Sequence, residues 1–224
     1  FSGKAHPADG GGQALIKQII NISKRPEFLG KVIFLENYSM EIGKLLTQGV
    51  DVWLNTPTRP KEASGTSGMK AALNGVVNFS VLDGWWAEGY RRDAGWSLPL
   101  ERTYEDQNLQ NELDAETIYN VLEYDILPTY FDRDEQDIPT KWLFYIKNII
   151  AEVAPTFTMK RMLDDYYDKF YNKLGIRGKE LKEGDFARSK NIIKWKDWMN
   201  EQWNHIKVDS MDVYDTDNYS LPAN

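Results

Sequence analysis

A lysine, a glutamate and several small polar residues are the groups in this sequence best suited to chemistry. They lie together in the segment Glu62-Ala63-Ser64-Gly65-Thr66-Ser67-Gly68-Met69-Lys70. Its small residues favour a tight loop, and the residues that follow favour a helix. With Thr66 or Ser67 as the N-cap, Lys70 falls in the first helical turn, where the helix dipole disfavours a cation. Lys70 is then a candidate for a neutral amine that forms a Schiff base, beside backbone amides that attract phosphate. A surface lysine beside a Gly/Ser turn is the alternative that these residues also allow.

Apolar and helical patterns alternate around this loop. Continuous apolar runs predict buried strands at 31–35, 50–54 and 76–82, and a further strand that ends near Lys4. Helical spacing predicts helices at 13–23 and 40–48. The alternation predicts an α/β fold with a parallel, doubly wound sheet, in which ligands bind at the carboxyl ends of the strands. We therefore expect four strand ends to converge on one crevice. These ends lie near Lys4, Tyr38, Glu62 and Asp83.

The second half of the chain has a different pattern. Residues 85–101 are rich in Trp, Gly, Arg and charge, which predicts an irregular surface loop with solvated Glu88, Arg91 and Arg92. Helices are predicted at about 114–127, 140–153 and 159–174, with prolines in the breaks. An amphipathic helix is predicted from Ala187 to about His205, with Trp195 and Trp198 as a packing stripe.

Composition excludes several classes of protein. The net charge of −7 and the pI near 5.0 argue against a nucleic-acid-binding face. No apolar run approaches the roughly 18 residues of a membrane helix. The absence of cysteine excludes a thiolate metal site. The sequence has only two histidines, which argues against a histidine-based metal site. The lack of cysteine also fits a cytoplasmic location.

The lysine segment resembles a known family. Together with Asn74-Gly75 and Leu82-Asp83-Gly84, it is similar to the pyridoxal-phosphate lysine segment of the α-glucan (glycogen/maltodextrin) phosphorylases. Arg59-Pro60 and the run from Asp83 to Tyr90 look like the shorter bacterial and archaeal branch. The resemblance implies the C-terminal half of a two-domain GT-B glycosyltransferase fold, with a Rossmann-like parallel sheet followed by helices. Residues 1–105 would be part of the cofactor and glucosyl-site domain, 106–208 a helical region completing it, and 209–224 an acidic tail or the start of a further segment.

The resemblance also implies a cofactor site. Lys70 matches the lysine that binds pyridoxal 5′-phosphate as a Schiff base. Thr66, Ser67 and the amides around Gly65 match the cradle of the cofactor phosphate, and Tyr38 matches a tyrosine of the cofactor pocket.

A glucosyl site is implied next to it. Glu62 matches a carboxylate that binds sugar hydroxyls, and Ala63, Ser64 and Gly65 match backbone donors to the same sugar. Two positions depart from the larger family members, which carry arginine where Ser39 stands and asparagine where Gly68 stands. Because Ser39 stands in place of the arginine, the contact that this arginine makes with the cofactor phosphate is in doubt.

The implied reaction is the reversible phosphorolysis of α-1,4-glucan to glucose 1-phosphate, with Lys70 and Glu62 as the catalytic candidates. The partners would be the glucan, inorganic phosphate, glucose 1-phosphate and an N-terminal domain of the same protein, and homo-oligomers are compatible with this assignment. The family's basic phosphate cluster and its glucan-binding domain lie upstream of the matched segment. We therefore expect this polypeptide to be inactive by itself.

Two other functions compete with this interpretation. A nucleotide-sugar-dependent GT-B transferase, similar to glycogen synthase, carries a Glu-x₇-Glu pattern whose second carboxylate binds the donor. Here Lys70 occupies the second position, and lysine cannot accept hydrogen bonds from ribose hydroxyls. A non-catalytic sugar-binding module that uses the Trp and Tyr side chains would leave Lys70 unmodified.

Overall fold

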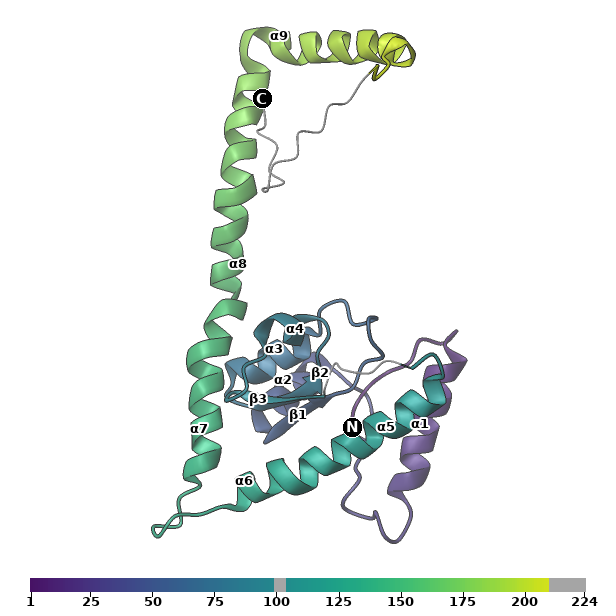
Figure 1. Ribbon diagram of the computed structural model, residues 1–224, viewed down its shortest axis with the longest axis vertical. Coiled ribbons are helices and arrows are strands. Elements are labelled where there is room, and N and C mark those ends of the chain that lie inside the picture. Colours follow the sequence, from purple (N-terminus) through teal and green to yellow (C-terminus); the bar gives the residue numbers. More distant parts are fainter. Residues whose placement is uncertain (99–103, 210–224) are drawn as a thin grey trace. The chain divides into compact units, whose positions relative to one another are not determined.

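Three short parallel strands form the sheet, in the order β1-β2-β3 (Figure 1). They are β1 (Val52–Asn55), β2 (Val77–Val81) and β3 (Gly95–Leu98). The central strand β2 pairs in parallel with both neighbours, with Val52 opposite Val77 and Val81 opposite Leu98. Every residue of β2 is buried, as expected for a strand that is covered on both faces. The predicted α/β fold with a parallel sheet is confirmed.

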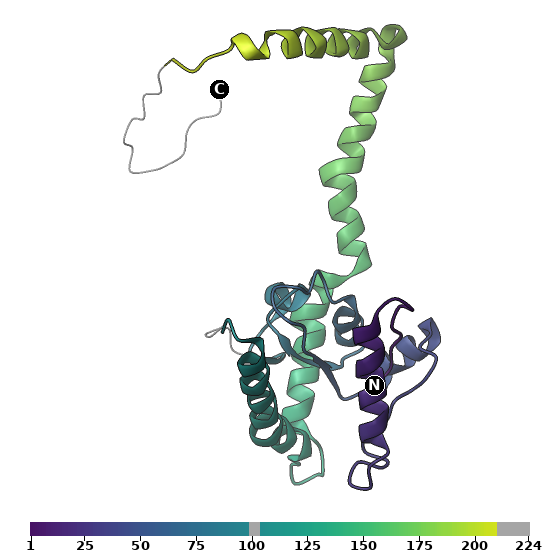
Figure 2. The same ribbon diagram turned by 90° about the vertical axis from the view of Figure 1, so that its right-hand side faces the viewer.

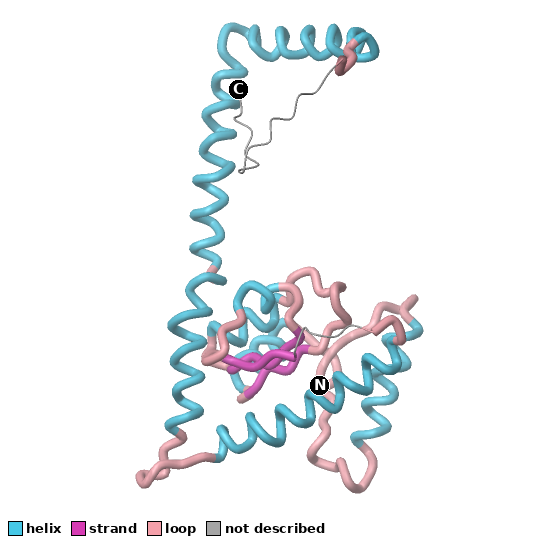
Figure 3. Tube along the Cα trace, viewed as in Figure 1, coloured by secondary structure: helices cyan, strands magenta, loops and turns pink. Residues whose placement is uncertain are grey.

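This computed structural model describes residues 1–98 and 104–209, and its contacts divide the chain into residues 1–162 and 163–224. Figure 3 shows helices and loops around the strands of the first part. Its α-helices are α1 (Gly10–Ser23), α2 (Met40–Gly49), α3 (Thr66–Leu73), α4 (Trp85–Gly89), α5 (Gln107–Val121), α6 (Leu127–Phe131) and α7 (Thr140–Asn148). Its π- and 3₁₀-helical turns are η1 (Leu122–Ile126), η2 (Ile149–Val153) and η3 (Ala154–Phe157). None of the helices in the described ranges is both long and apolar enough to cross a membrane.

Helices cover both faces of the sheet (Figures 1 and 2). On one face, alternate side chains of β2 contact Leu98, Ile126 and Trp142 in one buried cluster. On the other face, α3, α4 and η2 contribute a second cluster built around Trp85 and Trp86. Both clusters exclude water from apolar side chains, which is the main stabilising contribution to such a layered fold.

The strand predicted at 31–35 is absent, and this prediction was wrong. A single parallel bridge between Ser2 and Leu35 stands in its place. The N–H groups of Lys31 and Val32 both donate to the carbonyl of Phe28, at 2.9 and 3.0 Å, so a turn uses the donors that a sheet would need. Leu35 is 40% exposed, so this segment also lacks the cover that a buried strand requires.

The loop predicted at 85–101 was also wrong over its described part. Residues 85–89 form α4 and residues 95–98 form β3. Trp85 and Trp86 are buried, with their ring centroids 4.9 Å apart, and the indole N–H of Trp86 donates to the carbonyl of Trp96 at 3.0 Å. The tryptophans that suggested a surface loop are therefore core residues, while Glu88, Arg91 and Arg92 are exposed as predicted.

Most of the predicted helices are present. Those at 13–23, 40–48 and 140–153 correspond to α1, to α2, and to α7 with η2. The helix predicted from 114 begins earlier, at Gln107, because the Asp106 carboxylate caps it by accepting hydrogen bonds from the N–H groups of Asn108 and Leu109.

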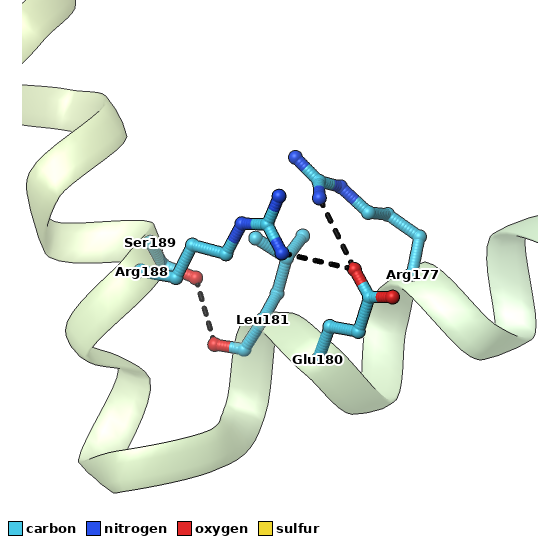
Figure 4. A network of polar contacts seen from close by, with 5 residues as sticks. All are labelled: Arg177, Glu180, Leu181, Arg188 and Ser189. Carbon is cyan, nitrogen blue, oxygen red and sulfur yellow. Dashed lines mark hydrogen bonds and ion pairs between the residues drawn. The ribbon is translucent and has the colours of Figure 1, made fainter.

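Residues from 163 onward are helical as far as His205. They contain the end of α8 (Met159–Tyr166), then η4 (Tyr167–Tyr171), α9 (Asn172–Gln202) and η5 (Trp203–His205). The backbone of α9 leaves the helical conformation from Glu183 to Phe186, so a new helical stretch starts at Ala187 and matches the predicted amphipathic helix. Glu180 joins the two parts of α9, since its carboxylate accepts hydrogen bonds from Arg177 at 3.2 Å and Arg188 at 3.1 Å (Figure 4).

Two predictions for this region have different outcomes. Trp195 and Trp198 do not form a packing stripe in the described residues, since their side chains are 58% and 54% exposed. The segment expected at 209–224 lies, apart from Asp209, outside the described residues.

Candidate functional site

The loop before α3 ends at Gly65, which is the N-cap of the helix. Gly65 has a φ of 78°, a left-handed conformation that glycine adopts without a steric penalty, and no side chain caps this helix end. The unpaired amides of the first turn therefore remain available to an anion. Because α3 is an eight-residue helix that starts at Thr66, Lys70 lies in its last turn. The expectation that the helix dipole would disfavour the charged lysine was therefore wrong, since cations are favoured at that end.

Asp83 fastens this loop to the turn after β2. One oxygen of its carboxylate accepts a hydrogen bond from the N–H of Glu62 at 3.0 Å, and the other accepts one from the N–H of Gly84 at 2.9 Å. The N–H of Trp85 donates to the carbonyl of Ser64 at 2.7 Å. A Cβ atom on Gly84 would lie 2.6 Å from that carbonyl oxygen, so only glycine allows the two segments to approach so closely.

Trp85 lies directly against the first turns of α3. A Cβ atom on Gly68 would lie 2.6 Å from the indole nitrogen and 3.0 Å from two ring carbons. The ring is 3% exposed and contacts Phe157 edge-on, with the centroids 5.0 Å apart. Gly68 therefore provides the space that the tryptophan occupies.

A pocket of about 440 Å³ lies beside α3 and α2. Lys70, Ser67 and Asn74 line it from α3 and the residue after that helix, and Trp53 lines it from β1. The remaining lining residues come from α2 and the segment before it: Tyr38, Met40, Gly43, Lys44, Thr47 and Gln48. None of these ten residues is acidic.

The structure divides the predicted site residues into two groups. Tyr38, Ser67 and Lys70 share the pocket. Glu62 and Gly65 do not line this pocket and lie close to each other, with a carboxylate oxygen of Glu62 2.9 Å from the position of a Cβ on Gly65. Ala63 and Thr66 are exposed, and Ser64 is half-buried.

Of the four strand ends expected to meet, the structure joins only two by a hydrogen bond. Glu62 and Asp83 are directly connected. Tyr38 lies in the pocket that contains Lys70, and Lys4 is not among the residues that line it. The prediction that all four ends meet in one crevice was therefore wrong: Glu62 and Asp83 are joined, whereas the pocket that Tyr38 lines contains neither of them and does not contain Lys4.

Sequence reasoning did not find the contributions of α2. Gly43 accommodates Tyr38, because a Cβ at that position would lie 2.5 Å from the tyrosine hydroxyl. Lys44, the next residue, lines the pocket together with Lys70. A glycine next to a lysine inside a predicted helix was the available signal, since a glycine there usually has a packing reason.

The sequence of this chain is similar to those of known proteins. The sequence model of the carbohydrate phosphorylase family matches residues 1–90, which contain the loop, α3 and the pocket residues. A glycogen phosphorylase of Aquifex aeolicus is 48% identical over 174 residues, which are 78% of this chain and 25% of that protein. The chain belongs to the carbohydrate phosphorylase family. Its phosphorylase relatives also include a maltodextrin phosphorylase of Thermococcus litoralis, 38% identical over 100% of this chain and 26% of that protein.

Another phosphorylase relative has a similar coverage. A glycogen phosphorylase of Mycobacterium bovis is 36% identical over 94% of this chain and 24% of that protein. The chain thus spans about a quarter of the length of these curated relatives.

The pocket suits the pyridoxal phosphate that the resemblance implies. It has a primary amine for an aldehyde in Lys70, a hydroxyl in Ser67 and a second cationic side chain in Lys44. Its volume of about 440 Å³ lies within the usual range of small-molecule sites. The donor set therefore fits an aldehyde that carries a phosphate.

Proposed function

We propose that this chain provides the cofactor pocket and the glucosyl site of an α-glucan phosphorylase with a GT-B fold. The observation that carries the proposal is the pocket in which Lys70 and Ser67 of α3 face the same space as Tyr38. In support, relatives named glycogen phosphorylase and maltodextrin phosphorylase align with most or all of the chain. In this proposal, residues 1–105 belong to the Rossmann-like domain and residues 106–208 complete it.

The cofactor-binding residues act together at α3. Lys70 would hold pyridoxal phosphate through its amine, and Tyr38 would form a wall of the pocket. The hydroxyls of Thr66 and Ser67 and the free amides after Gly65 would bind the phosphate, because the N-terminus of α3 has no side-chain cap. When bound, the cofactor supplies a phosphate group that assists proton transfer to and from the substrate phosphate.

The glucosyl site would lie at the loop itself, outside the set of residues that line the pocket of Lys70. Glu62 would accept hydrogen bonds from sugar hydroxyls, and the backbone N–H groups of Ala63, Ser64 and Gly65 would donate to the same sugar. Asp83 keeps this loop in place through the N–H of Glu62, so the carboxylate of Glu62 is presented by a backbone that is already fixed. Such fixed donors and acceptors lower the cost of binding a sugar in one orientation.

The proposed reaction is the reversible phosphorolysis of α-1,4-glucan to glucose 1-phosphate in the cytoplasm. The glucan and inorganic phosphate are the substrates, and Lys70 and Glu62 are the catalytic candidates. The described pocket has two lysines, whereas two phosphates brought together in a cleft need several cations to offset their repulsion. We therefore expect the 224-residue chain by itself to lack phosphorolysis, with an N-terminal domain of the same protein needed for activity.

The test is to trap the cofactor and map its position. The chain and the complete gene product are incubated with pyridoxal phosphate, reduced with borohydride and digested, and the modified peptides are identified. We expect the complete gene product to carry one stoichiometric adduct at Lys70 and to release glucose 1-phosphate from maltodextrin. Lys70→Ala should abolish both, and Lys61→Ala, which removes an exposed lysine of the same loop, should change neither.

Two outcomes would contradict the proposal. An active gene product without an adduct at Lys70 would exclude the cofactor assignment. Glucosyl transfer from a nucleotide sugar, with no dependence on phosphate, would favour the competing transferase.

A further inference from the structure

Lys44 was not among the predicted site residues. It lies on α2 and lines the same pocket that Lys70 lines from α3. The two lysines come from α2 and α3, which pack against each other, so the pocket has a cationic side chain on each of two walls. Lys44 is exposed, and no ion pair is recorded for it or for Lys70 among the residues that the structure describes. Both amines are thus available to a ligand.

The charge around this pocket differs from that of the chain as a whole. The chain has 34 acidic and 27 basic residues, with a net charge of −7. The ten residues that line the pocket include two lysines and no carboxylate. A locally positive site on an otherwise negative protein attracts anions, because their potential energy is lower there than elsewhere on the surface. The hydroxyls of Ser67 and Tyr38 add hydrogen-bond donors for anionic oxygens.

We propose that Lys44 is a phosphate-binding residue of this pocket and pairs with the phosphate of the ligand whose aldehyde reacts at Lys70. The proposal rests on the proposed function and assigns to α2 a role that the lysine loop does not supply. The helix is well suited to this role. Its N-cap Ser39 accepts a hydrogen bond from the N–H of Ile42 at 3.2 Å, and Gly43 accommodates Tyr38. The start of α2 and the pocket tyrosine are therefore fixed next to Lys44.

The experiment measures how fast Lys70 is modified in the 224-residue chain. Short pulses of pyridoxal phosphate, or of pyridoxal without its phosphate, are followed by borohydride and peptide mapping. The amine condenses with the aldehyde and releases water, and borohydride supplies the hydride that makes the new C–N bond permanent. Lys17, an exposed residue of α1 outside the pocket, is the internal reference in every sample.

We expect pyridoxal phosphate to modify Lys70 faster than Lys17 in the unchanged chain. Lys44→Met should lower this rate about two- to fivefold, as expected for the loss of one solvent-exposed charge contact. The rate with pyridoxal should stay the same, and Lys44→Arg should restore most of the rate with pyridoxal phosphate. Added salt should reduce the difference between Lys44→Met and the unchanged chain, because it screens exposed charges.

The outcomes separate the two proposals. If Lys70 reacts faster than Lys17 but Lys44→Met leaves the rate with pyridoxal phosphate unchanged, the role of Lys44 is wrong and the cofactor pocket stands. An equal fall with both aldehydes would also exclude a phosphate contact, because the variant would then act on the shape of the pocket. If Lys70 reacts no faster than Lys17, both the pocket assignment and the role of Lys44 are overturned.

Discussion

The contact between Gly68 and Trp85 predicts that a substitution which normally stabilises a helix will destabilise this one. Replacing glycine by alanine inside a helix is usually stabilising by about 0.5–1 kcal/mol, because alanine loses less conformational entropy on folding. At Gly68 the added Cβ would lie 2.6 Å from the indole nitrogen of Trp85, whereas ordinary contacts begin at 3.4 Å. The ring or the helix would therefore have to move by about 0.8 Å, which is the difference between these two distances.

The indole has little freedom to make this movement. It is 3% exposed, and it contacts Trp86 and Phe157 with ring centroids 4.9 and 5.0 Å away. Overpacking of such a core costs about 1–3 kcal/mol. Subtracting the gain in helix propensity leaves a range of about 0–2.5 kcal/mol, and from its middle we expect Gly68→Ala to lower the free energy of unfolding by about 1 kcal/mol.

The assay is urea denaturation followed by far-ultraviolet circular dichroism, so that changes in tryptophan emission do not affect the signal. Gly11→Ala in α1 is the matched control, since its Cβ would lie at an ordinary 3.6 Å from a carboxylate oxygen of Asp9. The control should be neutral or stabilising. In a Trp85→Phe background, Gly68→Ala should cost less, because the indole nitrogen is gone. Stabilisation by Gly68→Ala, or an equal cost with and without the indole, would refute the reasoning.

Two further predictions concern Asp83 and Tyr145. Asp83→Ala should lower the free energy of unfolding by about 1–3 kcal/mol, because the N–H groups of Glu62 and Gly84 lose their acceptors. Urea denaturation measures this change. Asp83→Asn keeps one acceptor oxygen and should therefore cost less. Burial raises the pKa of Tyr145 above its ordinary 10.0, and the nearby carboxylates of Asp93 and Asp125 raise it further. In alkaline solution the folded state therefore keeps the phenol proton of Tyr145 at a pH at which the unfolded state releases it. The contribution of Tyr145 to stability is fully present below about pH 10 and is lost as the pH rises through the folded-state pKa. Denaturation at several alkaline pH values should show this loss in the unchanged chain and a smaller one in Tyr145→Phe.

Each of these predictions has a matched control. Asp51→Ala removes an exposed carboxylate and should leave the stability unchanged within about 0.5 kcal/mol. Tyr124, which is 70% exposed, can be replaced by phenylalanine without altering the alkaline dependence. If Asp51→Ala lowers the free energy of unfolding as much as Asp83→Ala, the proposed role of Asp83 in holding the loop is contradicted. An alkaline dependence that Tyr145→Phe leaves intact would assign it to another group.

Two strands and three helices agree closely with the prediction, and in each of them the reason is a local sequence pattern. The runs that became β1 and β2 are apolar and bounded by turn residues, and α1, α2 and α7 have apolar residues at helical spacing. The predictions of secondary structure were wrong where the same residue types have a different role in the fold. The apolar run at 31–35 has no buried residue and forms a single bridge, whereas the tryptophans at 85 and 86 are buried among residues of α3 and η2. Hydrophobicity alone does not distinguish these two situations, because burial depends on what lies opposite.

The sequence by itself determined the chemical groups of the candidate site, the family and the tight loop before α3, because these depend on residue types at short separations. Only the tertiary structure decided that α3 starts at Thr66, directly after its N-cap Gly65, and places Lys70 in its last turn, since the start depends on the backbone conformation of one glycine. It also decided that Asp83 fastens the loop, that Gly68 makes room for Trp85, and that α2 brings Lys44 to the pocket. These pairs are 17 to 26 positions apart in the sequence, and their geometry follows from how the helices pack on the sheet, which no local pattern specifies.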